Sequence, residues 1–257
     1  MKTTIAYIIG FVLSIITLSG QVVLQSGLTH RFSAPPGSYD TFPIKLKNIG
    51  LKPCGFSIEL ADLSIECDSG YRYLKPGTTA QSCAQWLESE RYTGSLAPQE
   101  EILIKVIMRI PEDYNLPSAQ ACLLISSLPL EDPQDLKKLQ VRMRYALNVL
   151  YRNPMVPGVV ALHAKTLRMD SIKGVWALRY LNTGNVDRII SSKAHLLNEN
   201  GQVIYRTESL HSKSFIPNQC RTLEFPSQDL PSGKYQMVVV SHTDLGEKFG
   251  LTHSFER

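Results

Sequence analysis

The feature that most constrains this sequence is a succession of short β-rich segments separated by Pro, Gly, Asn and Asp, with almost no amphipathic helical stretch. In the longest segment, residues 139–151, apolar side chains stand at every second position: Val141, Met143, Tyr145, Leu147 and Val149. Arg142 and Arg144 fall between them and belong to the opposite face. This period of two is typical of a strand with one buried side, so the chain is expected to be all-β.

The other expected strands are short and evenly spread. In the first half they are residues 42–47, 56–60, 102–110 and 121–126, and in the second half residues 159–165, 175–182, 194–198, 202–206, 221–225, 234–242 and 250–255. Asn200-Gly201 predicts a hairpin with a type I′ turn, which needs positive φ at both positions. Tyr235, just after the turn at residues 230–233, is expected to form a tyrosine corner. Short strands with frequent turns indicate immunoglobulin-like sandwiches.

The two halves of the chain repeat one pattern. A strand followed by Asn-x-Gly occurs at residues 45–50 (KLKNIG), with Asn48, and at residues 179–184 (RYLNTG), with Asn182. A turn containing proline precedes an apolar strand at residues 97–99 and again at residues 216–218. Two copies of one sandwich explain this repeat better than one long domain.

The domain boundary is expected where two prolines and a glycine interrupt the strands, at residues 152–158. We predict an all-β fold of two immunoglobulin-like β-sandwich domains in tandem, set at an angle. The N-terminal domain would span residues 28–152 and the C-terminal domain residues 158–257. Trp86 and Trp176 are expected in the cores.

The N-terminus predicts export. Lys2 precedes an apolar run at residues 5–18, and small residues follow at Ser19 and Gly20, so residues 1–20 are predicted to be a signal peptide. The run is shorter than the roughly 20 residues that span a membrane. An uncleaved N-terminal anchor is the alternative.

An exported chain with cysteines is expected to form disulfides. The five cysteines are Cys54, Cys67, Cys83, Cys122 and Cys220. The sequence does not choose among the pairings of the first four, and Cys220 has no partner in its own half. The odd number leaves at least one thiol free or intermolecular.

Composition and motifs argue against several functions. The net charge is +4, but most basic residues are interleaved with acids, so no nucleic-acid stripe or polybasic membrane patch stands out. No Gly-x-Ser-x-Gly, His-Glu-x-x-His, CxxC or Gly-rich phosphate loop is present. His242 and His253 would suit a metal only if they faced each other across the hairpin near Leu245-Gly246, and a surface pair is the expected arrangement. We predict no enzyme activity, no metal and no cofactor.

Three stretches give the chain a resemblance to the periplasmic chaperones of pilus assembly, the chaperone–usher family. Residues 109–114 (RIPEDY) lead into residues 119–129 (AQACLLISSLP), as in the family's passage from a proline through a strand to further prolines. Residues 82–86, ending in Trp86, are followed by a strand and Leu96-Ala97-Pro98, similar to the family's Trp and Pro region. The strand ending in residues 151–154 (YRNP) is similar to the last strand of the family's first domain.

The resemblance implies a function based on strand addition. Such a chaperone donates that last strand to a subunit whose own sandwich lacks one, and the donor residues here would be Leu139, Val141 and Met143. The family anchors the subunit's terminal carboxylate with two basic residues in the interdomain cleft, which would be Arg31 and Arg144. Ala146 stands where the family's donor strand has lysine, so Arg144, two residues away on the same face, is taken as its substitute.

The resemblance also implies a periplasmic location and the partners. These would be pilin-like protein subunits and an outer-membrane usher, without nucleic acid or nucleotide, and with membrane contact only through the uncleaved signal peptide. Residues 139–150 would then form an exposed, unpaired edge. The rival interpretation is a secreted or surface module of two immunoglobulin-like domains that binds a partner through its loops. A hydrolase would need an acid, a histidine and a nucleophile brought together.

Overall fold

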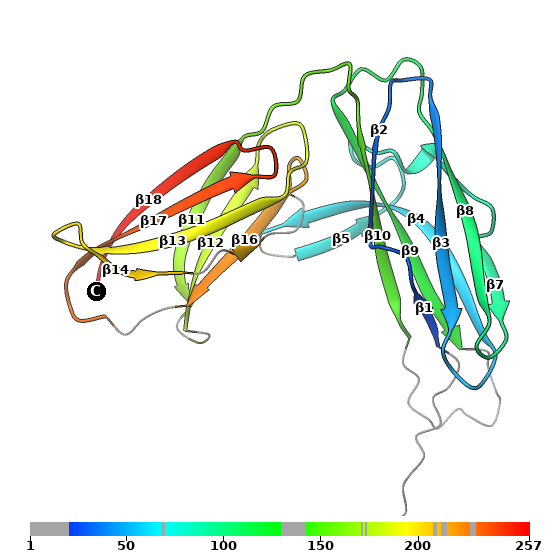
Figure 1. The fold of residues 1–257 in the computed structure, drawn as a ribbon, viewed down its shortest axis with the longest axis horizontal. Helices are drawn as coiled ribbons and strands as arrows, with labels where there is room; N and C mark the ends of the chain where they lie inside the picture. The colour runs from blue at the N-terminus through cyan, green and yellow to red at the C-terminus, as the bar shows by residue number, and fades with distance from the viewer. Residues whose placement is uncertain are drawn as a thin grey trace, which may run out of the picture.

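A computed structural model describes residues 21–67, 70–129, 142–170, 172, 174–207, 210–211, 215–226 and 230–257. The described strands pack as two immunoglobulin-like sandwiches set at an angle, which confirms the predicted fold class (Figure 1). The one helical element among these residues is the short 3-10 turn η1 (Ala84–Trp86). None of the described residues forms a helix long and apolar enough to cross a membrane. The predicted signal peptide, residues 1–20, lies outside the described residues.

The first sandwich packs a four-stranded sheet against a six-stranded sheet. The four-stranded sheet has the order β1 (Val22–Leu24), β3 (Tyr39–Asn48), β8 (Glu101–Arg109), β6 (Leu87–Ser89). The six-stranded sheet has the order β2 (Thr29–Ser33), β10 (Arg144–Arg152), β9 (Ser118–Pro129), β4 (Cys54–Glu66), β5 (Gly70–Leu74), with β7 (Thr93–Leu96) also on β4. Apolar side chains from both sheets fill the core, including Phe56, Ile44, Ile104, Leu123 and Leu147.

The second sandwich repeats this plan with fewer strands. One sheet has the order β11 (Leu162–Asp170), β12 (Val175–Asn182), β16 (Cys220–Pro226). The other has the order β14 (Val203–Arg206), β13 (Ile190–Asn198), β17 (Lys234–Thr243), β18 (Lys248–Glu256), with β15 (Leu210–His211) also on β13. Residues 153–161, which contain no strand, connect the two sandwiches.

The repeated Asn-x-Gly pattern has the same structural role in both sandwiches. Asn48 and Asn182 each end a central strand, and both side chains are fully buried. Each Oδ1 accepts a hydrogen bond at 2.9 Å from the N–H of the glycine two residues on. Each Nδ2 donates to backbone carbonyls of the segment before the repeated proline, at Leu96 and Ala97 or at Phe215. The residue after that proline has positive φ in both copies, 64° at Gln99 and 59° at Asn218.

Other local predictions are confirmed or corrected by the structure. The Tyr235 hydroxyl donates to the carbonyl of Pro231 at 2.9 Å, which confirms the tyrosine corner. The hairpin between β13 and β14 is present, but only Gly201 has positive φ, so its turn is not type I′. His253 lies opposite Met237 and His242 opposite Lys248, so these histidines do not face each other.

Each tryptophan packs against the core of a different sandwich. Trp86 packs edge-on against Tyr114 and Tyr151 in the first sandwich, with ring centroids 4.6 and 5.5 Å away. Trp176 packs 4.4 Å from the Phe255 ring in the second. Both are partly buried at the rim of their cores.

Candidate functional site

Strand β10 has an edge that is open over nearly half of its length. On one side it pairs antiparallel with β9 from Arg144 to Arg152. On the other side it pairs parallel with β2 only from Asn148 to Arg152. Among the described residues, no strand pairs with the stretch from Arg144 to Leu147 on that side. The expected unpaired edge over residues 139–150 is therefore corrected to this shorter stretch within the described part of the chain.

Backbone directions along β10 follow from two hydrogen bonds. The N–H of Ser127 on β9 donates to the carbonyl of Met143 at 2.8 Å, so the odd-numbered backbone groups point towards β9. The N–H of Asn148 donates to the carbonyl of Leu28 at 2.9 Å, so the even-numbered groups point towards β2 and the open edge. The N–H and carbonyl of Ala146 consequently face the open edge, where an added strand would pair with them.

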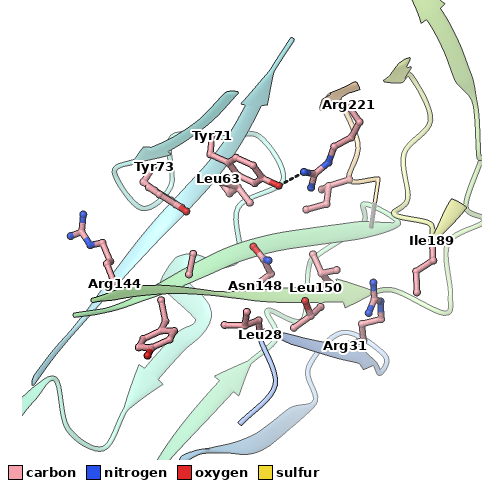
Figure 2. Close-up of a pocket in the computed structure, with 14 residues that line it drawn as sticks. Leu28, Arg31, Leu63, Tyr71, Tyr73, Arg144, Asn148, Leu150, Ile189 and Arg221 are labelled. Atoms are coloured by element: carbon pink, nitrogen blue, oxygen red, sulfur yellow. Dashed lines mark hydrogen bonds between the residues drawn. The ribbon is translucent and has the colours of Figure 1, made fainter. Parts of the chain in front are cut away.

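Side chains of β10 alternate between the core and a cavity between the two sandwiches. Leu147, Val149 and Tyr151 are buried in the core of the first sandwich. The alternate residues Ala146, Asn148 and Leu150 line a cavity of about 510 Å³ (Figure 2). The rest of the first sandwich's lining is Leu28, Thr29, Arg31, Leu63, Tyr71, Tyr73, Arg144 and Tyr145, and the second sandwich contributes Ile189, Ile216 and Arg221.

The charged side chains in this lining are all arginines. Arg31 Nε lies 3.4 Å from Asp187 Oδ2 of the second sandwich. Arg144 Nη2 lies 3.1 Å from Glu59 Oε2, and both of these side chains are about half exposed. Arg221 hydrogen-bonds the Tyr71 hydroxyl, and its guanidinium lies 5.1 Å from the centroid of the Tyr71 ring. Every charged side chain in the lining is therefore cationic, although Arg31 and Arg144 are each paired with an acid that lies outside the lining.

The structure does not bring the predicted anchor pair together at one point. Arg31 lies opposite Leu150, and Arg144 is six residues earlier on β10. At about 3.3 Å per residue the two positions are roughly 20 Å apart along the strand. Figure 2 accordingly shows Arg144 at one end of the cavity, with Arg31 and Arg221 at the other. Both predicted arginines line the same cavity, but from opposite ends.

The predicted donor residues are only partly described. Leu139 and Val141 lie outside the described residues. Met143, half-buried, directly precedes β10 and bonds β9 through its carbonyl. Tyr145, which continues its face of the strand, packs against the core.

The second sandwich closes one side of the cavity through the segment that leads into β16. Ile216 is buried in an apolar cluster with Leu63 and Leu150 of the first sandwich. Gln219 Nε2 donates to the carbonyl of Leu63 and to Gln120 Oε1, both at 3.3 Å. These contacts join residues far apart in the sequence, and the sequence pattern did not identify Tyr71, Ile216 or Arg221 as part of the site.

A cluster of charges lies where β10 leaves the first sandwich. The Arg188 side chain is 5% exposed, and its Nε lies 3.4 Å from Glu247 Oε2. Burial and then the neighbouring Arg188 lower the pKa of Arg152, although Asp187 acts in the opposite direction. The hydrogen bond from Thr243, with a further contribution from Arg188, lowers the pKa of Glu247. The end of β10 therefore brings Arg152 beside charged residues of the second sandwich.

The described residues contain no group of three or more His, Cys, Asp or Glu side chains that could hold a metal ion. Cys67 and Cys220 form a disulfide, and Cys54, Cys83 and Cys122 are free and buried. The sequence left the disulfide pairing open, and the lack of a partner for Cys220 in its own half is the signal that could have pointed to this bond.

No protein-family model and no curated protein sequence matches the chain. Solved structures that are similar to it include the chaperone YadV, with 13% identity, coverage of 91% of this chain and 99% of that chain, and a TM-score of 0.47. The CsuC–CsuE complex of Csu pili from Acinetobacter baumannii has 11% identity, coverage of 91% and 97%, and a TM-score of 0.49. The E. coli chaperone DraB has 16% identity, coverage of 93% and 98%, and a TM-score of 0.41. YadV, CsuC and DraB are all chaperones.

Proposed function

We propose that this protein is a periplasmic chaperone-like protein that binds and stabilises pilus, fimbrial or related surface-fibre subunits by donating a β-strand. The observation that carries the proposal is the open edge of β10 from Arg144 to Leu147, which lies beside the interdomain cavity. An exposed strand edge pairs readily with another chain, and pockets for alternate side chains give such pairing its specificity. The protein would act without catalysis, metal or cofactor.

The proposal assigns roles along the strand. Leu139, Val141 and Met143 would donate side chains to the subunit, and the Ala146 backbone would pair with it. Because Arg31 and Arg144 are roughly 20 Å apart along β10, we assign the terminal carboxylate to Arg31 alone. Arg144 would contact the bound segment further from its end. The domains would be residues 28–152 and 158–257, although β1 packs in the first sandwich ahead of residue 28.

The experiment removes one backbone hydrogen-bond donor from β10 and leaves the pairing of β10 with β9 intact. Ala146→Pro deletes an N–H that faces the open edge, and proline is tolerated at such positions. Ala146→Val keeps the N–H and is the matched control. Each variant would be tagged and used to capture proteins from the host's periplasmic extract, with identification of the captured proteins by mass spectrometry.

Strand donation predicts that wild type and Ala146→Val capture small β-rich subunits and that Ala146→Pro loses them. In the purified complex, the amide of Ala146 should be protected from hydrogen exchange. Capture of the same subunits by all three proteins would refute the role of this edge. Retention of no β-rich subunit by wild type would favour a binding module that uses its loops.

A further inference from the structure

The Cys67–Cys220 disulfide crosses from one sandwich to the other. Cys67 directly follows β4 of the first sandwich, and Cys220 is the first residue of β16 in the second. The two Cα atoms are 4.9 Å apart, although 153 positions separate the residues in the sequence. Figure 1 shows β4 and β5 reaching beyond the rest of their sandwich towards β16. The sandwiches therefore have two covalent connections, the disulfide and residues 153–161.

The residues on either side of Cys220 also contact the first sandwich. Gln219 bonds Leu63 and Gln120, and Arg221 bonds the hydroxyl of Tyr71. Tyr71 and Arg221 both line the cavity. The disulfide thus sits beside the contacts that form one wall of the cavity, and movement at Cys220 would carry that wall with it.

The five cysteines differ in their access to redox reagents. Cys54, Cys83 and Cys122 are fully buried, and burial raises the pKa of Cys122 to about 12 and that of Cys83 further, so these two remain neutral thiols. Thiolates rather than thiols react with disulfides. Cys67 is partly buried and Cys220 is buried, so Cys67 is the more accessible residue of the disulfide.

We propose that Cys67–Cys220 is a redox-controlled lock that holds the two sandwiches at a fixed angle and so sets the shape of the cavity. The bond forms when the two thiols give two electrons and two protons to a disulfide oxidant such as oxidised glutathione, which becomes two thiols. It opens when an external thiolate attacks the Cys67 sulfur, forms a mixed disulfide and releases the Cys220 thiolate. A second thiolate then resolves the mixed disulfide. Once the lock is open, the sandwiches rotate about residues 153–161.

The first test counts thiols in the full chain. Protein purified without reductant is unfolded in guanidinium with iodoacetamide, and its mass is measured with and without prior reduction. The lock predicts three carbamidomethyl groups without reduction and five after reduction, as the three free cysteines and the one disulfide require. Five groups without reduction would show that the bond is absent and would overturn the proposal.

The second test measures the angle directly. Labels attached through non-canonical amino acids at the exposed positions Leu103 and Leu245, one in each sandwich, report an interdomain distance distribution. Oxidised protein should give a narrow distribution. Protein reduced under native conditions, and Cys67→Ser/Cys220→Ser, should give a broader one with unchanged tryptophan fluorescence. An equally narrow distribution after reduction would overturn the lock, and so would loss of the native fluorescence, because the bond would then maintain folding rather than the angle. Neither test uses a subunit, so the result is independent of the proposed function.

Discussion

The buried asparagines of the repeat allow a quantitative comparison of the two sandwiches. The Asn48 side chain makes five contacts within hydrogen-bond distance of backbone groups. Its Nδ2 carries only two hydrogens for three of those acceptors, so about four full hydrogen bonds are made. The Asn182 side chain makes three such bonds. At about 1 kcal/mol net for each bond, Asn48→Ala should cost about 4 kcal/mol and Asn182→Ala about 3 kcal/mol.

Each loss of stability should be confined to one sandwich, and the two tryptophans can report the unfolding of the two sandwiches separately. Trp86 packs against the first core and Trp176 against the second. Oxidised protein in a Trp176→Phe background reports unfolding of the first sandwich, and a Trp86→Phe background reports unfolding of the second. With a urea dependence of about 2 kcal/mol per molar, the midpoints should fall by about 2 M for Asn48→Ala and about 1.5 M for Asn182→Ala.

The matched control is Asn200→Ala, at an exposed turn position, which should change stability by less than about 0.5 kcal/mol. A midpoint shift below about 0.5 M for either buried asparagine would be less than these bonds require. That result, or a shift confined to the other sandwich, would refute the view that the asparagine ties down the strand end in each copy.

Two further predictions concern single side chains. Tyr235→Phe removes the hydrogen bond to Pro231 and should lower the stability of the second sandwich by about 1 kcal/mol, measured by the Trp176 urea transition, and an unchanged midpoint would contradict the corner. His30 stacks 4.3 Å from the Phe42 ring, its Nε2 is buried without a partner among the described residues, and burial lowers its pKa below 6.5. The unfolded chain then binds the proton more readily than the folded chain does. The free energy of unfolding should therefore be unaffected by His30 above about pH 6.5 and should fall as the pH drops from there towards the pKa of His30 in the folded state. His30→Phe should flatten this part of the Trp86-monitored stability profile, and an equal slope in both proteins would refute the assignment.

The sequence was a good guide to the bounds of β12 and β8, but it predicted only part of the longer strands β4 and β9. The predicted segment 175–182 coincides with β12, and residues 102–110 overlap β8 almost completely. The short strands β1 and β5 were not predicted, because three to five residues carry too little alternation and their pairing depends on distant partners. For the same reason Tyr71 and Arg221 could not be placed in the site, since a hairpin and a strand from different sandwiches bring them together.

In strand β10, the direction of each side chain follows from the sequence pattern, whereas the extent of the open edge follows from tertiary structure. Its period of two correctly separates Leu147 and Val149, which face the core, from Arg144, which does not. The same period sends alternate backbone groups to β9 and to the opposite edge, whatever lies there. Whether that edge is free depends on β2, which begins pairing only at Asn148. The alternation of the strand could therefore be read from its own residues, but the length of its open edge is set by the register of another strand.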